Sequence, residues 1–98
     1  MVKIVLFCNA GMSTSLLINK MQKLADTQGF ECTVDAFATS RAADEGKDAD
    51  VILLGPQVRH ELKRIRELYP DTPVEPIDMM AYGRMDAEAV LNQVKSLI

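Results

Sequence analysis

The chain has little of what several functional classes require. Its 98 residues contain no tryptophan, one histidine and two cysteines. The 14 acidic residues outnumber the 11 basic ones and leave a formal net charge of −3, so there is no electrostatic case for binding nucleic acid. No apolar run approaches the roughly 20 residues that span a bilayer, and we expect no insertion into a membrane.

Signals for metals and nucleotides are also missing. Cys8 and Cys32 form no CxxC pair and His60 is the single histidine, so the sequence predicts no zinc site. The chain has neither three spaced glycines after a strand nor the Gly-Lys-Ser/Thr ending of a nucleotide P-loop. We therefore expect no metal, no nucleotide and no other cofactor. Two cysteines without a disulfide pattern, and an N-terminus without a signal-peptide pattern, predict a cytoplasmic protein.

Strand-like and helix-like patterns alternate along the whole chain. Apolar runs predict strands at residues 2–7, 32–37, 51–54 and near 74–77, with amphipathic helices between and after them. Because the two kinds of element alternate, the pattern predicts an α/β fold with an open four-stranded parallel sheet and helices on both faces. At this length we expect residues 1–98 to form a single domain.

The helix patterns also predict particular buried faces and ends. The first helix should end at Gly29, Ser40 should cap a short helix within residues 39–48, and Asp86 should cap the last helix. The apolar positions expected to be buried are Leu16, Leu17, Met21, Leu24 and Ala25 in the first helix, Val58, Leu62, Ile65 and Leu68 in the third, and Val90, Leu91, Val94 and Leu97 in the last.

The most informative segment follows the first strand. Cys8 ends that strand, and a short loop of small and hydroxyl-bearing residues leads directly into the first helix. The free N–H groups and the dipole at a helix N-terminus stabilise negative charge, and they lower the pKa of a nearby thiol. We therefore predict that Cys8 is a nucleophile that accepts a phosphoryl group.

A phosphate on Cys8 would need a cradle, and the residues after it are suited to one. Gly11 permits a close approach of the backbone to an oxyanion, and the hydroxyl groups can add hydrogen bonds. The predicted phosphate-binding residues, acting mainly through backbone N–H groups, are Asn9, Ala10, Gly11, Met12, Ser13, Thr14 and Ser15. The alternative for Cys8 is an inert buried cysteine at a strand end, which is the interpretation we favour for Cys32.

Residues 6–17 closely resemble the phosphorylation loop of enzyme IIB components of the bacterial sugar phosphotransferase system, in the lactose/cellobiose/chitobiose family. Residues 49–58 and 76–83 fit the same family. The resemblance implies that Cys8 takes phosphate from a phosphohistidine on an enzyme IIA component. It further implies that the phosphate passes to a disaccharide of the cellobiose, chitobiose or lactose type, held by the membrane-embedded enzyme IIC.

The layout also resembles the flavodoxin-like fold of low-molecular-weight tyrosine phosphatases, whose phosphate loop has the form Cys-x5-Arg-Ser/Thr. Counted from Cys8, the position of that arginine is Thr14, so the chain lacks the guanidinium that would clamp a transferring phosphoryl group. Asp78 lies roughly where those phosphatases keep an acid, but a helix cap or turn is the favoured interpretation. A phosphatase or an arsenate-reductase-like cysteine enzyme remains the alternative function.

Three further features have weaker interpretations. The basic residues Arg59, His60, Lys63, Arg64 and Arg66 form a solvated polar face, and nothing in the sequence places His60 near Cys8.

Met12, Met79 and Met80 fall in loops expected around the cysteine, where flexible thioethers would suit two different partners; core packing is the alternative for the latter two. Met12→Asp should slow phosphate uptake while the fold stays intact. Tyr82 and Gly83 are expected to close the last loop without a chemical role.

Overall fold

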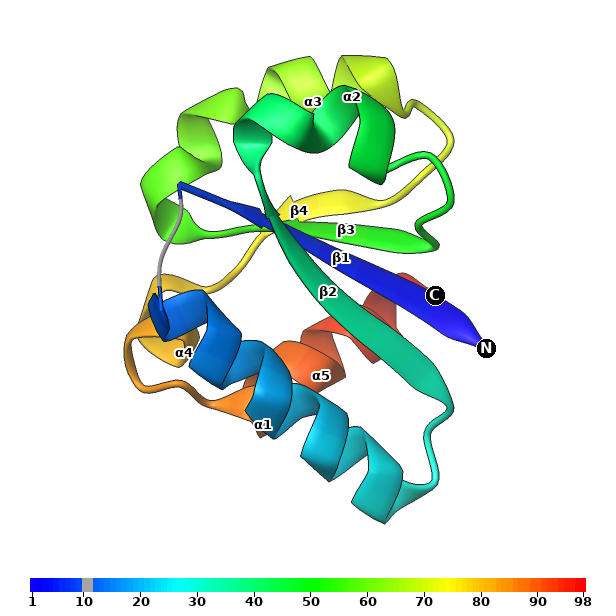
Figure 1. The fold of residues 1–98 in the computed structure, drawn as a ribbon, viewed down its shortest axis with the longest axis vertical. Helices are drawn as coiled ribbons and strands as arrows, with labels where there is room; N and C mark the ends of the chain where they lie inside the picture. Colours follow the sequence, from blue (N-terminus) through cyan, green and yellow to red (C-terminus); the bar gives the residue numbers. More distant parts are fainter. Residues whose placement is uncertain (10–11) are drawn as a thin grey trace.

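The computed structural model describes residues 1–9 and 12–98, and strands alternate with helices through them (Figure 1). The elements are β1 (Val2–Cys8), α1 (Met12–Gln28), β2 (Cys32–Ala38), the 3-10 turn η1 (Thr39–Arg41), α2 (Ala42–Glu45), β3 (Val51–Leu54), the 3-10 segment η2 (Pro56–Glu61), α3 (Leu62–Leu68), β4 (Val74–Pro76), α4 (Met79–Gly83) and α5 (Ala87–Leu97).

The four strands form one parallel sheet in the order β2-β1-β3-β4. β1 is central: it pairs with β2 along its whole length, from Val2 with Cys32 to Cys8 with Ala38, and with β3 as far as Phe7 with Leu54. The predicted four-stranded parallel sheet is confirmed. Because all strands run the same way, their carboxyl ends meet at one edge, which is the left edge of the sheet in Figure 1.

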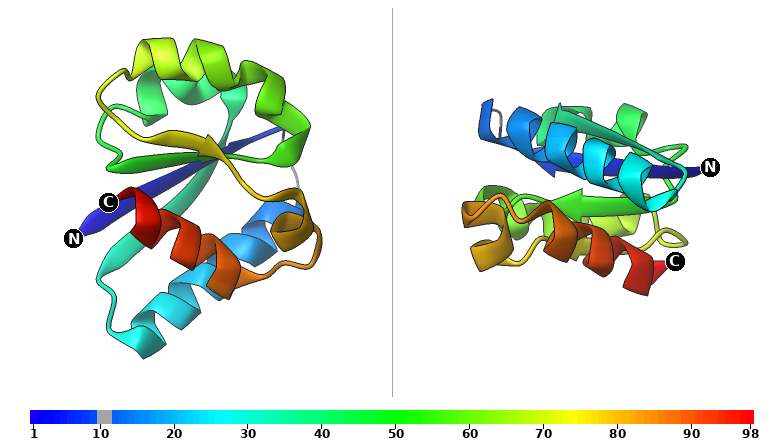
Figure 2. Two further views of the ribbon diagram at one scale, coloured as in Figure 1. Left: turned by 180° about the vertical axis from the view of Figure 1, so that it is seen from behind. Right: turned by 90° about the horizontal axis from the view of Figure 1, so that it is seen from below.

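Two layers of helices cover the sheet. α1, α4 and α5 lie on one face, and η2, α2 and α3 lie on the other (Figures 1 and 2). Side chains of β1 alternate between these layers: Ile4 and Leu6 belong to the core under α1 and α5, whereas Val5 and Phe7 belong to the core under α3. The central strands are therefore apolar on both faces, as a buried parallel sheet requires.

The predicted ends of two helices are confirmed. Gly29 follows α1 with a φ of 71°, and the next N–H, that of Phe30, donates to the Ala25 carbonyl at 2.9 Å. This αL termination suits glycine because a Cβ is disfavoured at positive φ. At the start of α5, the Asp86 carboxylate accepts a hydrogen bond from the Ala89 N–H at 3.1 Å.

Three local predictions are wrong. Ser40 caps no helix, because residues 39–41 form η1 and α2 begins only at Ala42, without a side-chain cap. Leu16 is 55 % exposed, because the buried line of α1 passes through Leu17, Met21 and Ala25, and Leu16 lies about 100° away from Leu17 around the helix. Leu68 is exposed at the last residue of α3.

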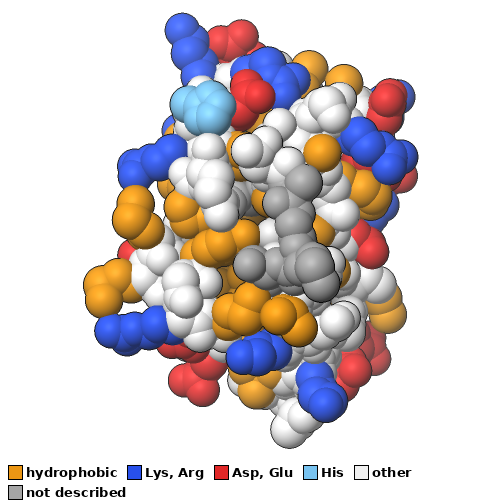
Figure 3. All heavy atoms as spheres, turned by 60° about the vertical axis from the view of Figure 1, so that its left-hand side comes forward, with side chains coloured by type: hydrophobic (Ala, Val, Ile, Leu, Met, Phe, Trp, Pro, Cys, Tyr) orange, Lys and Arg blue, Asp and Glu red, His pale blue; other side chains and the backbone are white. Residues whose placement is uncertain are grey.

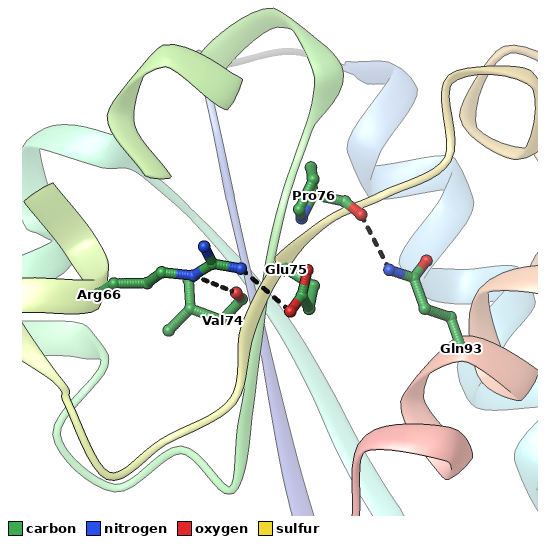
Figure 4. A network of polar contacts seen from close by, with 5 residues as sticks. All are labelled: Arg66, Val74, Glu75, Pro76 and Gln93. Carbon is green, nitrogen blue, oxygen red and sulfur yellow. Dashed lines mark hydrogen bonds and ion pairs between the residues drawn. The ribbon is translucent and has the colours of Figure 1, made fainter. Parts of the chain in front are cut away.

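The outer edge of β4 is closed by side chains from both layers (Figure 4). Arg66 of α3 donates from Nε to the Val74 carbonyl at 3.0 Å and forms an ion pair with Glu75 at 3.0 Å. Gln93 of α5 donates from Nε2 to the Pro76 carbonyl at 2.8 Å, and Pro76 itself has no N–H. Free carbonyl groups on an edge strand invite pairing with another strand, and these contacts occupy them.

Candidate functional site

The carboxyl edge of the sheet contains a topological switch point between its two central strands. From β1 the chain crosses one face of the sheet through α1 and reaches β2. From β3 it crosses the opposite face through η2 and α3 and reaches β4, on the opposite side of the two central strands. In open α/β sheets the crevice between two such strands is the usual ligand site. Cys8 ends β1 at this point, as the sequence predicted.

Cys8 is closely surrounded. It is 5 % exposed, and its neighbour across the sheet on the β2 side is Ala38. On the β3 side, the Gly55 N–H donates to the Phe7 carbonyl at 2.9 Å. A Cβ added to Gly55 would lie 2.9 Å from the Gln57 Oε1 atom and 3.4 Å from the Cys8 Cβ, so the turn after β3 passes directly beside the cysteine.

Helix α1 begins at Met12, four residues after Cys8, and runs for 17 residues. Its N-terminus is therefore at the same edge of the sheet as the thiol (Figure 1). Of the seven predicted cradle residues, Asn9 and Ser15 are exposed, and Ala10 and Gly11 lie outside the described residues. Met12 and Ser13 belong to the first turn of α1, but their side chains also lie outside what the structure describes.

Thr14 differs from the other hydroxyl-bearing residues of this turn. Its side chain is buried, with 3 % exposure, and its Oγ1 lies 2.8 Å from the hydroxyl of Tyr82 in α4. Sequence reasoning missed this role of Tyr82. The available signal was the position of Thr14, three residues before Leu17 on the buried line of α1, because a polar side chain on an apolar face needs a hydrogen-bond partner.

The loop after β4 leads into α4 at the same edge. The Asp78 carboxylate accepts a hydrogen bond from the Ala81 N–H at 3.0 Å, so the interpretation of Asp78 as a helix cap is confirmed. Met79 and Met80 are 61 % and 62 % exposed, which excludes core packing for both. Figure 3 shows this end of the molecule, where exposed hydrophobic side chains lie among Lys and Arg side chains.

A cavity of about 390 Å³ opens beside these residues. It is lined by Pro56, Arg59, Pro76, Ile77, Asp78, Met79 and Gln93. These residues come from the ends of β3 and β4 and the turns after them, with Gln93 from α5. The guanidinium of Arg59 is exposed. The carboxyl edge is therefore hollowed next to the exposed methionines.

Cys32 lies at the other end of the sheet. It begins β2, is buried, and faces the carboxyl-terminal half of α1, where Gln22 donates to its carbonyl at 3.0 Å. Burial raises the pKa of the Cys32 thiol, the charge of Asp26 raises it further, and Lys95 opposes them. A neutral, buried thiol fits the structural role predicted for Cys32.

The basic residues of η2 and α3 are mostly paired or exposed. Arg64 forms an ion pair with Glu61 at 3.1 Å and also donates to the Thr39 carbonyl. His60 is exposed in η2. These contacts agree with a solvated polar face.

Two observations concern other kinds of site. Within residues 1–9 and 12–98, no three His, Cys, Asp or Glu residues lie close enough together to hold a metal ion. Over the same residues, no helix combines the length and apolar character needed to cross a membrane.

Comparison with protein families matches residues 3–93 to the family described as "PTS system, Lactose/Cellobiose specific IIB subunit". The chain belongs to this family. It is thus a IIB component of the lactose/cellobiose type, and such components act as phosphotransferases in sugar phosphorylation. The resemblance noted in the sequence is confirmed over nearly the whole chain.

Individual relatives agree with this family. The chain is 41% identical to the oligo-beta-mannoside-specific EIIB component of Bacillus subtilis, over 100% of this chain and 97% of that protein. It is 38% identical to the cellobiose-specific EIIB component of Lactococcus lactis subsp. lactis, over 97% of this chain and 94% of that protein.

Solved structures show the same fold. The cellobiose-specific IIB component from Borrelia burgdorferi superposes with a TM-score of 0.75 at 39% identity, covering 93% of this chain and 85% of that one. The lactose-specific IIB domain from Streptococcus pneumoniae gives a TM-score of 0.82 at 17% identity, covering 96% and 95% of the two chains. The predicted flavodoxin-like, phosphatase-like fold class is confirmed.

Proposed function

We propose that this IIB component carries a phosphoryl group on Cys8, received from a phosphohistidine of a IIA component and passed to a disaccharide bound by a membrane IIC component. The observation that carries the proposal is the position of Cys8. It ends a central strand at the switch point of the sheet, directly before the N-terminus of the 17-residue helix α1. A thiolate and a phosphate are both stabilised by such a helix end.

The proposed chemistry consists of two transfers. In the first, the Cys8 sulfur attacks phosphorus, the P–N bond of the phosphohistidine breaks, and the thiol proton ends on the imidazole. In the second, a sugar hydroxyl oxygen attacks phosphorus, the S–P bond breaks, and the proton of that hydroxyl returns to the thiolate. Backbone N–H groups of residues 9–15 are the proposed cradle of the phosphoryl oxygens, with further hydroxyl donors from Ser13 and Ser15. The Thr14 hydroxyl, which the sequence also offered as a donor, is instead engaged by Tyr82.

The structure supports a carrier over a phosphatase. Thr14 stands where the phosphatase loop has its arginine, and its hydroxyl is hydrogen-bonded to Tyr82. The carboxylate of Asp78, the candidate general acid of the alternative, already accepts a backbone hydrogen bond as the cap of α4. A threonine at the position of the arginine, together with an Asp78 that caps α4, favours a phosphocysteine that survives until the next partner arrives.

We propose further that sugar choice belongs to the IIC component. The named sugars of the relatives differ, from oligo-beta-mannosides to galactose and cellobiose, although each relative aligns with at least 97% of this chain. In this proposal, residues 1–98 form one domain. That domain meets its two protein partners in the cytoplasm. Met12, Met79 and Met80 are the proposed contact residues around it, and the exposure of the last two supports that role.

The test is to incubate the protein with a phosphorylated IIA component and to measure its intact mass. Wild type should gain one phosphoryl group and Cys8→Ser should gain none; a mass gain in Cys8→Ser would refute the carrier assignment. Incubation with an aryl phosphate tests the alternative, because a phosphatase would turn it over and a carrier would not. Addition of a sugar-loaded IIC component should then remove the phosphoryl group.

A further inference from the structure

The contact between Thr14 and Tyr82 joins two segments that are 68 residues apart in the sequence. Thr14 is the one buried polar side chain in the part of the chain that the structure describes. A buried hydroxyl without a partner is destabilising, whereas a valine of the same shape would need none. In the part of the chain that the structure describes, the Tyr82 hydroxyl is the partner that satisfies Thr14.

Tyr82 is itself held firmly. The Tyr82 N–H donates to the Asp78 carbonyl at 2.9 Å, and the Tyr82 carbonyl accepts from the Met85 N–H at 3.1 Å. Its ring packs against the core formed by α1 and α5, and its helix α4 starts at the Asp78 cap. The hydroxyl is thus presented to α1 from a segment whose backbone is fixed on both sides of Tyr82.

Thr14 is the third residue of α1, in the first turn, whose backbone N–H groups have no partner within the helix. Three residues, 9–11, separate this turn from Cys8 in the sequence. We propose that Tyr82 is a positioning residue: by holding the Thr14 hydroxyl, it fixes the first turn of α1 in the place where the phosphoryl group on Cys8 is bound. This inference rests on the proposed function and names a residue that serves it from outside the loop.

The proposal predicts a defect in the transfer step itself. Tyr82→Phe removes one hydroxyl and keeps the ring, so the fold and the outer surface stay as they are. At saturating phosphorylated IIA component, the single-turnover rate of phosphoryl transfer to Cys8 should fall about fivefold to tenfold, the size expected for one buried hydrogen bond. The concentration of donor that gives half the maximal rate should not change, because the lost group does not touch the donor.

The chain offers a matched control in its second tyrosine. The Tyr69 hydroxyl donates to the Ala42 carbonyl on the opposite face of the sheet. Tyr69→Phe therefore loses a comparable part-buried hydrogen bond far from α1, and it should lower the denaturation midpoint without slowing transfer. If the Tyr69 and Tyr82 variants slow transfer equally, the effect is one of general stability and the proposal is wrong.

Variants of Thr14 complete the test. Thr14→Val should slow transfer to the same extent as Tyr82→Phe, and Thr14→Ser, which keeps the hydroxyl, should recover most of the rate that Thr14→Val loses. The double variant Thr14→Val with Tyr82→Phe should be no slower than either single variant, since all three lack the same bond. A slow Thr14→Val beside a normal Tyr82→Phe would overturn the proposal, because Thr14 would then act on the phosphate alone.

Cys8→Ser in the same assay separates the two hypotheses. If the intact mass of that variant still increases by one phosphoryl group, the proposed function fails, whatever the tyrosine variants do. If it accepts none and Tyr82→Phe transfers at the wild-type rate, the carrier stands and only the positioning role is lost.

Discussion

The two cysteines of this chain sit at opposite ends of the sheet and at opposite ends of the same helix. Both are buried to a similar degree, with exposures of 5 % for Cys8 and 4 % for Cys32, and both are free thiols at strand ends. Cys8 is followed by the N-terminus of α1, whereas Cys32 follows its C-terminus. Burial is therefore not what distinguishes them. They differ in the helix end that adjoins them along the chain, which is the N-terminus of α1 for Cys8 and its C-terminus for Cys32.

The largest expected effect of this difference between the two cysteines is on the reactivity of their thiols. At neutral pH, Cys8 should react with iodoacetamide severalfold faster than Cys32, because the start of a helix favours a negatively charged group whereas burial raises the pKa of the Cys32 thiol. The single variants Cys8→Ser and Cys32→Ser, followed by mass spectrometry, separate the two rates. Equal rates in the folded protein would show that the helix end does not distinguish these thiols.

The surface next to Cys8 is expected to matter for its partners. Replacing both Met79 and Met80 with aspartate should raise the donor concentration needed for half-maximal transfer by about tenfold, since an apolar contact is lost and charge is added at a desolvated surface. Leu68→Asp is the matched control, as it changes an exposed apolar side chain at the end of α3. An unchanged donor requirement in the double variant would remove these methionines from the interface.

The Cys32 end of α1 should respond in stability alone. Gly29→Ala places a Cβ on a residue with a φ of 71°, and it should lower the free energy of unfolding by about 1 kcal/mol. Gly83→Ala is the control, because the structure shows open space around Gly83 and no positive φ. Urea unfolding measures both variants, and a loss of phosphoryl transfer in folded Gly29→Ala would contradict the division between the two ends.

The smallest effect concerns alkaline pH. Since burial raises the pKa of the Cys32 thiol, the unfolded chain releases this proton at a lower pH than the folded chain does. The free energy of unfolding should therefore be unaffected below the ordinary thiol pKa of about 8.5 and should fall above it, by less than about 1.4 kcal/mol per pH unit. Cys32→Ala should remove this part of the slope between pH 7 and 9.5, and an identical slope in both proteins would contradict it.

Much of the fold could be predicted from local sequence patterns. The apolar run ending in Cys8, the continuous strand at residues 51–54 and the caps at Gly29 and Asp86 each depend on neighbouring residues, and each was predicted correctly. The parallel sheet followed from the alternation of strands and helices.

What could not be predicted depends on contacts between distant segments. Tyr82 was given no chemical role because its hydroxyl finds Thr14 only after α4 and α1 have packed on the same face of the sheet. Leu16 was expected to be buried because its apolar side chain fits the helical period. The face of α1 that packs on the sheet instead buries Thr14 and Leu17 and leaves Leu16 exposed. Ser40 looks like a cap in the sequence, but the chain turns there in a 3-10 conformation.

The closed edge of β4 bears on how long partners stay bound. A protein that adds a strand to an open sheet edge forms a row of main-chain hydrogen bonds. Arg66 and Gln93 occupy the Val74 and Pro76 carbonyl groups, so a partner arriving beside Cys8 on this side finds no strand to extend. Strand pairing is therefore disfavoured on this side. The proposed carrier would serve two partners in turn, so release would be as necessary as capture, and an edge closed to strand pairing suits brief encounters.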